Sequence, residues 1–258
     1  MLVHEFGDKK NPVIVLLPGT ACYWKGNFGH VIDELSQDFL VASVSYTGFD
    51  EEDKGTFHSV TEEVELIEDY VNEHYNGNIL CAYGCSLGGS LVGLLTQRNR
   101  IKMKYGILGS SDLDECGPVK AKLLGKLFTK LVYPLIHEGR FRNRLLQKRY
   151  EKRMAEDDHY NQAFMAIVGS NEHDMSFLSR ESLYNQFVSD PITPLDEKID
   201  NGSTQIHVFY ALKMGEKYRE CYLRHFKDPV IHEHDLRHEE LLALYPEKWC
   251  ELIREICL

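Results

Sequence analysis

The segment Gly84-Cys85-Ser86-Leu87-Gly88 sets a serine between two glycines, after an apolar run at residues 79–83 and before a helix-forming run at residues 87–98. At a strand-turn-helix junction, a G-x-S-x-G segment can hold its serine hydroxyl exposed on a sharp turn. A serine hydroxyl is a weak nucleophile, so it needs a base and donors for the oxyanion that forms on attack. We expect Ser86 to be the nucleophile. The neighbouring thiol of Cys85 is the less suitable alternative, because this turn exposes the central residue.

Two backbone N–H groups are expected to bind the oxyanion. The N–H of Leu87 begins the helix after Ser86, where the helix dipole also favours negative charge. The second is expected from the loop that follows the strand at residues 13–17, which reads Pro18-Gly19-Thr20. We assign it to the N–H of Thr20, with Gly19 allowing the turn. The alternative interpretation of Pro18-Gly19 is a turn that merely ends the strand.

Three histidines near the C-terminus, His232, His234 and His238, are candidates for the base. His238 is favoured because it lies in a loop just before a helical run. His232 and His234, two residues apart, share one face of a strand and need no chemical role. Three histidines at this spacing also suggest a zinc site, but no further ligands are evident. We expect no metal and no other cofactor.

A carboxylate should orient the histidine ring and stabilise its cationic form. We expect Glu216, the first carboxylate after the strand at residues 205–211. Glu216 has an alternative interpretation as an exposed residue at a helix start, where the dipole favours carboxylates. Asp112, just after the strand ending at residue 109, is the main alternative acid. Less favoured candidates for the acid are Asp190, Asp228 and Asp235.

The hydrophobic periodicity of the sequence predicts the strands and helices that position these residues. Strands are predicted at residues 2–6, 13–17, 39–46, 78–83, 105–109, 205–211 and 229–234. Helices are predicted between them at residues 28–36, 59–75, 87–98, 217–226 and 246–256. Continuous apolar runs such as VIVLL are typical of strands that are covered on both faces. The alternation predicts an α/β fold, with a mostly parallel sheet of about seven strands and helices on both faces.

The alternation of strands and helices stops between residues 111 and 200. Apolar residues from 123 to 136 form a helical stripe, which we expect Pro134 to end or kink. Further helices are predicted at residues 141–155, 158–168 and 175–188. We therefore expect a core made of residues 1–110 and 201–258. Residues 111–200 are expected to be a helical cap inserted over the carboxyl ends of the strands.

Composition limits the class of protein. The chain has 258 residues, 43% of them hydrophobic and 27% charged, as in ordinary globular proteins. Seven cysteines without a C-x-x-C pair suggest reduced thiols. No apolar stretch reaches signal-peptide length or the roughly 18 residues of a transmembrane helix, so we expect a cytoplasmic protein without a transmembrane segment.

Charge is distributed unevenly. Residues 120–153 contain eleven Lys and Arg against Glu138 and Glu151, a local charge of +9 that leaves −20 for the rest of a chain whose net charge is −11. An acidic chain is not expected to bind nucleic acid. The basic segment could draw anionic or amphiphilic substrates, or an anionic membrane surface. The alternative is a solvated helix whose lysines face water or pair with the acidic remainder.

Together the elbow segment YGCSLGGSLVGLL, the LLPGT turn, the carboxylate loop and His238 resemble the serine α/β-hydrolase family over nearly the whole chain. Pro18 stands where the family's oxyanion turn has histidine, and Met214 where many relatives carry the acid. The final HEELL, followed by Pro246 and Trp249, is similar to small bacterial α/β-hydrolases. The resemblance implies an ester hydrolase, esterase- or lipase-like, that forms an acyl-enzyme from a small ester or acyl substrate. The alternatives are an acyltransferase, thioesterase or peptidase, or a ligand-binding protein with weak catalysis.

Overall fold

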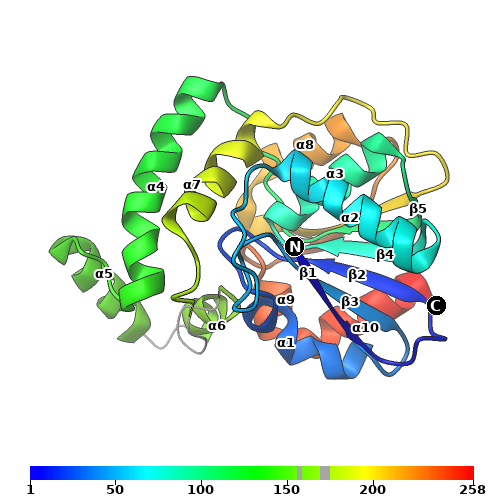
Figure 1. Cartoon of the computed structure of the whole chain (residues 1–258), viewed down its shortest axis with the longest axis horizontal. Coiled ribbons are helices and arrows are strands. Elements are labelled where there is room, and N and C mark those ends of the chain that lie inside the picture. Colours follow the sequence, from blue (N-terminus) through cyan, green and yellow to red (C-terminus); the bar gives the residue numbers. More distant parts are fainter. Residues whose placement is uncertain (156–158, 169–174) are drawn as a thin grey trace.

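Seven strands form one sheet in the computed structural model, which describes residues 1–155, 159–168 and 175–258. The strands are β1 (Leu2–Phe6), β2 (Val13–Leu17), β3 (Leu40–Ser45), β4 (Asn78–Gly84), β5 (Lys102–Leu108), β6 (Gln205–Ala211) and β7 (Val230–His234). Their order is β1-β3-β2-β4-β5-β6-β7; β1 pairs antiparallel with β3, and each of the other pairs is parallel (Figure 1). The predicted α/β class with a mostly parallel sheet is confirmed.

Helices cover both faces of this sheet. One face carries α1 (Trp24–Leu35), α9 (Glu240–Leu244) and α10 (Pro246–Cys257), and the other carries α2 (Val60–Tyr75), α3 (Leu87–Arg98) and α8 (Glu216–His225), as Figure 1 shows. The central strands are accordingly buried, with Ile14, Leu16 and Leu17 of β2 at 0% exposure. Burial on both faces explains why these strands have continuous apolar sequences instead of alternating ones.

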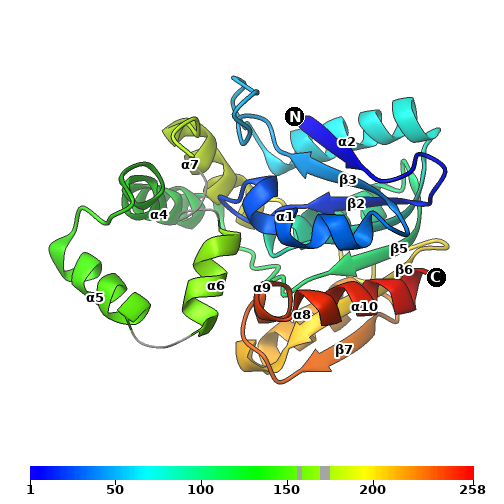
Figure 2. The same ribbon diagram turned by 90° about the horizontal axis from the view of Figure 1, so that it is seen from below.

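Between β5 and β6 the chain forms a helical segment (residues 111–200). It contains α4 (Pro118–Glu138), α5 (Arg144–Ala155), α6 (His159–Ile167), α7 (Arg180–Ser189) and the 3₁₀ helix η1 (Asp190–Ile192). Figures 1 and 2 show α4, α5 and α6 beyond the end of the sheet toward which the parallel strands point. In this segment α4 packs along α7, and α6 packs against α9.

Pro134 does not end its helix as expected: α4 continues through it to Glu138. Proline removes one helical hydrogen bond, and the burial of Pro134, Leu135 and Ile136 offsets that loss.

Among the predicted helices, α1 and α7 begin farthest from their expected starts at residues 28 and 175. Helix α1 begins at Trp24 because Trp24 is itself buried in the core. Helix α7 begins only at Arg180, because the Ser179 hydroxyl accepts a hydrogen bond from the N–H of Ser182 and caps the helix there. The helix predicted at residues 158–168 is α6, and residue 158 lies outside the described residues. In the part of the chain that the structure describes, no helix has the length and apolar character needed to cross a membrane.

Candidate functional site

Strand register brings four loops to one end of the sheet. Leu17 of β2 is paired with Gly84 of β4, and Gly84 is paired with Leu108 of β5. These three strands therefore end level with one another. The loops that follow them hold Thr20, Ser86 and Asp112, and the loop after β7 holds His238. Convergence at the carboxyl ends of parallel strands is the usual origin of a site in an α/β sheet.

Ser86 lies on a strained turn between β4 and α3, with φ 48° and ψ −109°. A non-glycine residue in this region is held there by its surroundings. The flanking glycines allow the turn to be this tight. A Cβ on Gly84 would lie 2.1 Å from the backbone of Gly88, and a Cβ on Gly88 would lie 2.2 Å from the carbonyl oxygen of Leu17. The two glycines of the Gly-x-Ser-x-Gly segment are therefore required by packing at this junction.

A buried carboxylate lies beneath this turn. Glu239 is 3% exposed, and its Oε1 accepts hydrogen bonds from the N–H of Ser86 and the N–H of Ser110, both at 2.8 Å. The hydroxyl of Tyr83 donates to its Oε2 at 3.4 Å. On the other side of the serine, the hydroxyl of Ser111 donates to the carbonyl oxygen of Ser86 at 2.7 Å. Glu239 is thus a positioning residue that ties the Ser86 turn to the end of β5.

We expect Glu239→Ala to lower the free energy of unfolding by about 2–5 kcal/mol, because two buried N–H groups lose their acceptor. Glu239→Gln retains an oxygen that can accept both bonds, so its loss should stay within about 1 kcal/mol. Urea denaturation of both variants beside the wild type measures the difference. Equal losses in the two variants would show that charge, and not the hydrogen-bond acceptor, is what the turn requires.

The loop containing Thr20 is held by three side chains. The hydroxyl of Tyr46 donates to the carbonyl oxygen of Pro18 at 2.9 Å, and the N–H of Gly19 donates to Asn27 at 2.8 Å. The N–H of Ala21 donates to Oε1 of Gln186, a fully buried side chain of α7, at 2.7 Å. These hydrogen bonds hold the backbone of the residues on both sides of Thr20. In the described structure, neither the Thr20 N–H nor the Leu87 N–H forms a hydrogen bond, so both donors are unsatisfied.

Cys85 is unsuited to act as a nucleophile. It is 2% exposed, and burial, followed by the negative charge of Glu239, raises the pKa of its thiol well above the usual value. The reactive form of cysteine is the thiolate, so this thiol is unreactive.

His238 lies in the loop between β7 and α9, in contact with α6. The hydroxyl of Tyr160 donates to its carbonyl oxygen at 2.9 Å, and its ring centroid lies 6.0 Å from that of Phe164. Across residues 1–155, 159–168 and 175–258, no hydrogen bond joins the His238 ring to Ser86 or Asp112. The ring nevertheless lies close enough to Asp112 for a protonated His238 to oppose the rise in the pKa of that carboxyl.

Asp112 and Glu216 have different surroundings. Burial, followed by the charge of Asp114, raises the pKa of Asp112 against the opposing effect of His238. Glu216 is the first residue of α8, with its side chain 67% exposed and 3.6 Å from Arg219. The interactions of the described residues thus bring Asp112 into range of His238 and do not bring Glu216 there.

The other acids considered from sequence lie in different settings. Burial, followed by the charge of Asp112, raises the pKa of Asp190 to about 7 against the opposing effect of Ser90. Asp235 is 82% exposed and lies 3.6 Å from Lys213, and Asp228 is an exposed turn residue.

The two other candidate histidines, His232 and His234, lie on the last strand, β7. Nδ1 of His207 on β6 and Nε2 of His232 on β7 lie 3.0 Å apart, and the two rings are stacked. Burial lowers the pKa values of His232 and His234, so both rings favour the neutral state. Among the described residues, no group of three or more His, Cys, Asp or Glu side chains is arranged to hold a metal ion.

Sequence reasoning missed Glu239, Asn27 and Gln186. The available signal for Glu239 was its place directly after His238, where a second polar residue of the loop enters the same end of the sheet. No local pattern marks Asn27 or Gln186.

No family model matches this chain, and no curated protein matches it. Several solved structures match the chain. An alpha/beta hydrolase family protein from Desulfitobacterium hafniense superposes with a TM-score of 0.73 at 20% identity, covering 99% of both chains. An enol-lactonase from Burkholderia xenovorans LB400 gives 0.70 at 11% identity, with 98% of this chain and 95% of that chain covered.

A lipase-esterase related protein from Clostridium acetobutylicum gives a TM-score of 0.69 at 16% identity and 98% coverage of both chains. The match in each case extends over the sheet, the surrounding helices and the segment between β5 and β6. Over its full length, this chain therefore has the α/β-hydrolase fold.

Proposed function

We propose that the protein is a serine hydrolase that cleaves carboxylic esters through an acyl-enzyme intermediate. The observation that carries this proposal is the backbone of Ser86, held at φ 48° and ψ −109° on a turn that only the two glycines permit. Strain of this kind at an element junction is a feature of functional sites. The names of the neighbours, an enol-lactonase and a lipase-esterase related protein, support an ester substrate.

The proposed reaction begins with attack of the Ser86 hydroxyl oxygen on the ester carbonyl carbon while His238 takes its proton. The N–H groups of Thr20 and Leu87 bind the oxyanion. When the tetrahedral intermediate collapses, the bond to the leaving group breaks, and His238 returns its proton to the departing alkoxide. Water activated by His238 then hydrolyses the acyl-enzyme and frees Ser86.

For the acid we propose Asp112, the alternative from sequence, in place of Glu216. The support is its burial and its electrostatic interaction with His238. A carboxylate there would stabilise the imidazolium that forms when Ser86 is deprotonated. His238 forms no hydrogen bond to Ser86 or Asp112 within the described residues, and such bonds often tighten only when substrate binds.

We also propose that residues 111–200 act as the cap that selects the substrate. The support is the contact of α6 with the His238 loop and of α7 with the Thr20 loop, through Tyr160 and Gln186. Both contacts reach residues that would surround a bound ester. We propose a small ester or acyl compound as the substrate.

The second candidate is a ligand-binding protein with weak catalysis. It is favoured by the absence, among the described residues, of a hydrogen bond between His238 and Ser86. A histidine that does not contact the serine would leave the hydroxyl unactivated. An acyltransferase, thioesterase or peptidase would use the same residues, since the fold alone does not fix the substrate.

A fluorophosphonate probe tests the proposal, because it reacts covalently with an activated serine. We expect the purified protein to be labelled once, on the peptide that contains Ser86, and to hydrolyse nitrophenyl esters of short and medium chain length. Mass spectrometry identifies the labelled residue. Saturable binding of a small ester without labelling or turnover would favour the binding protein instead.

A further inference from the structure

The outer face of α4 carries an apolar stripe in contact with solvent. Val119, Leu123 and Leu127 follow one another at intervals of four residues, and they are 83%, 69% and 50% exposed. At 3.6 residues per turn they form one row along the helix. Soluble proteins rarely leave a row of large aliphatic side chains in water without a partner.

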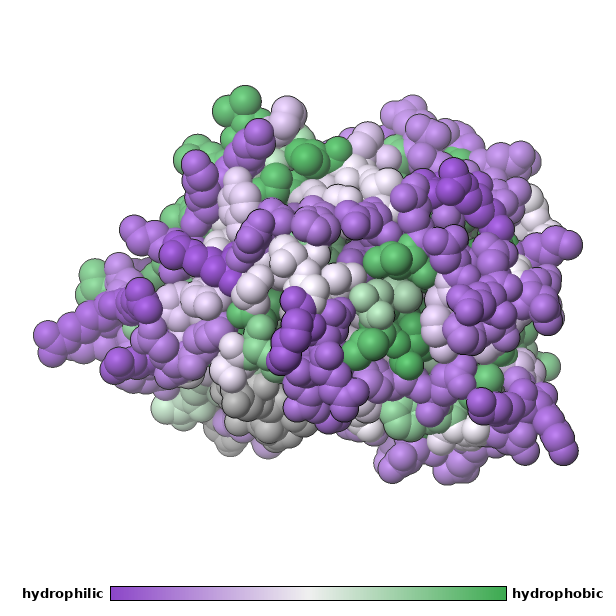
Figure 3. Space-filling view, viewed as in Figure 1, coloured by the Kyte–Doolittle hydropathy of each residue, from purple (hydrophilic) through white to green (hydrophobic). Residues whose placement is uncertain are grey.

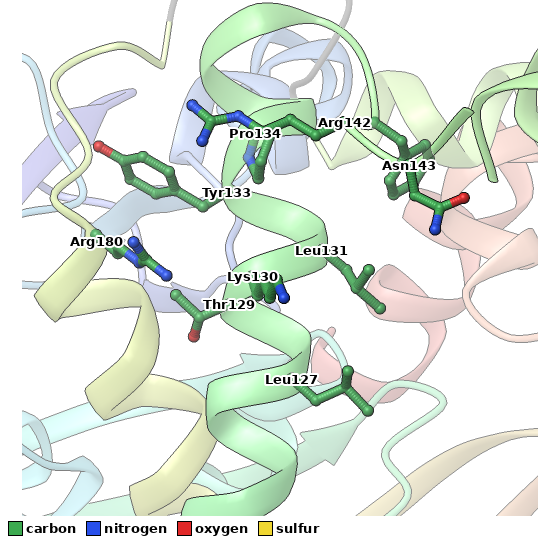
Figure 4. A pocket seen from close by; sticks show the side chains of 10 residues that line it. Leu127, Thr129, Lys130, Leu131, Tyr133, Pro134, Arg142, Asn143 and Arg180 are labelled. Atoms are coloured by element: carbon green, nitrogen blue, oxygen red, sulfur yellow. The ribbon is translucent and has the colours of Figure 1, made fainter. Parts of the chain in front are cut away.

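This row lies on the side of α4 opposite its contact with α7, and its last member, Leu127, also lines a cavity beside the helix. Buried Ala121, Gly125 and Thr129 form the opposite side of α4, and a Cβ on Gly125 would lie 2.5 Å from Val188 of α7. In Figure 4, which shows a cavity of about 540 Å³ beside α4, Leu127 projects away from Arg180 of α7. Figure 3 shows hydrophobic residues gathered at the N-terminal end of α4.

Positive charge borders the apolar row. Four lysines of α4, namely Lys120, Lys122, Lys126 and Lys130, are exposed, and the helix has no acidic residue before Glu138. No ion pair between described residues involves these lysines. Within the described residues, they therefore form no ion pair with the acidic remainder of the chain.

Helix α5, which follows α4 in the chain, is also exposed and basic. None of the residues of α5 is buried, and Leu145 is 73% exposed. Residues 140–153 add seven Lys and Arg against the single carboxylate of Glu151. Figure 1 shows α4 and α5 together at one end of the molecule, while the C-terminus lies at the other end.

We propose that the outer face of α4, extended by α5, docks on the surface of an anionic lipid bilayer. Aliphatic side chains flanked by lysines match a surface whose head groups are anionic and whose interior is apolar. The remainder of the chain, with its net charge of −20, is repelled by such a surface, so only this end of the molecule faces it. A symmetric contact between two copies of α4 is disfavoured, because it would oppose one row of lysines to the other.

Sedimentation with vesicles tests this proposal. We expect the protein to bind phosphatidylcholine vesicles that contain 30% phosphatidylserine, to bind pure phosphatidylcholine at least about tenfold more weakly, and to be released as salt rises from 50 to 500 mM. Leu123→Glu should weaken binding about tenfold or more, and Lys122→Glu with Lys126→Glu should do the same. The matched control is Leu258→Glu, at an exposed leucine on the far end of the molecule, which should bind like wild type.

Three results would overturn the proposal. These are absence of binding to anionic vesicles, binding that salt does not weaken, and equal behaviour of the Leu123→Glu and Leu258→Glu variants. A lipid-free dimer that Leu123→Glu dissociates would assign this face to a second copy. The esterase proposal is tested separately, because labelling of Ser86 by a fluorophosphonate in the wild-type protein needs no lipid.

Discussion

Ser86→Ala should lose at least about a thousandfold in kcat for nitrophenyl esters and should not be labelled by a fluorophosphonate. In the proposed mechanism, the substitution removes the one oxygen that forms the acyl bond. The N–H groups of Thr20 and Leu87 remain, so a small residual rate above that of water is expected. Steady-state turnover and probe labelling measure both effects.

The loss should not come from unfolding. Alanine retains the Cβ of serine, so the strain at φ 48° is unchanged and the free energy of unfolding should stay within about 1 kcal/mol of wild type. Ser86→Gly should relieve that strain and raise stability by about 1 kcal/mol, while it too loses labelling.

The matched control is Ser90→Ala, which removes a serine hydroxyl one turn further along α3. Ser90 is a buried residue of α3 and lies outside the proposed machinery. Its variant should be labelled and should turn over esters. If the Ser86→Ala protein is labelled and active to the same extent, the proposed mechanism is wrong.

The fold was predictable because its signals are local. Apolar runs such as residues 13–17 identify strands covered on both faces, and the alternation with helices fixes a parallel sheet. The turn at Ser86 was predictable for the same reason, since its two glycines lie within five residues. Local signals also mislead, as at Pro134, where burial of the last turn of α4 outweighs the lost hydrogen bond.

The supports of the site were not predictable, because they depend on contacts between distant residues. Glu239 accepts from the N–H of Ser86 across 153 positions, and Gln186 accepts from the N–H of Ala21 across 165. A sequence shows that each of these residues is polar. Only the folded chain shows which backbone donor each one meets.

The acid illustrates the same limit. Both candidates follow strands that end near His238, so sequence position alone could not separate them. The two carboxylates differ in their surroundings. Asp112 is partly buried, and a positive charge on His238 would lower its pKa. The Glu216 side chain is exposed to solvent and lies beside Arg219.

We therefore expect Asp112→Asn to lower kcat for nitrophenyl esters by about 10² to 10⁴, with a much smaller change in KM. An amide cannot stabilise the imidazolium of His238 when Ser86 is deprotonated. Glu216→Gln changes an exposed carboxylate in the same way and should stay within about twofold of wild type. Kinetics of both variants between pH 6 and 9 test the assignment.

The pH profile separates catalysis from folding. The carboxylate of Asp112 favours the protonated imidazole, so its loss should lower the apparent pKa of the basic group in the kcat/KM profile. A purely structural role for Asp112 would lower the rate without moving that pKa. If Glu216→Gln shows the large loss and the shifted profile while Asp112→Asn shows neither, Glu216 is the acid, and the α8 end of the molecule must move toward His238 when substrate binds.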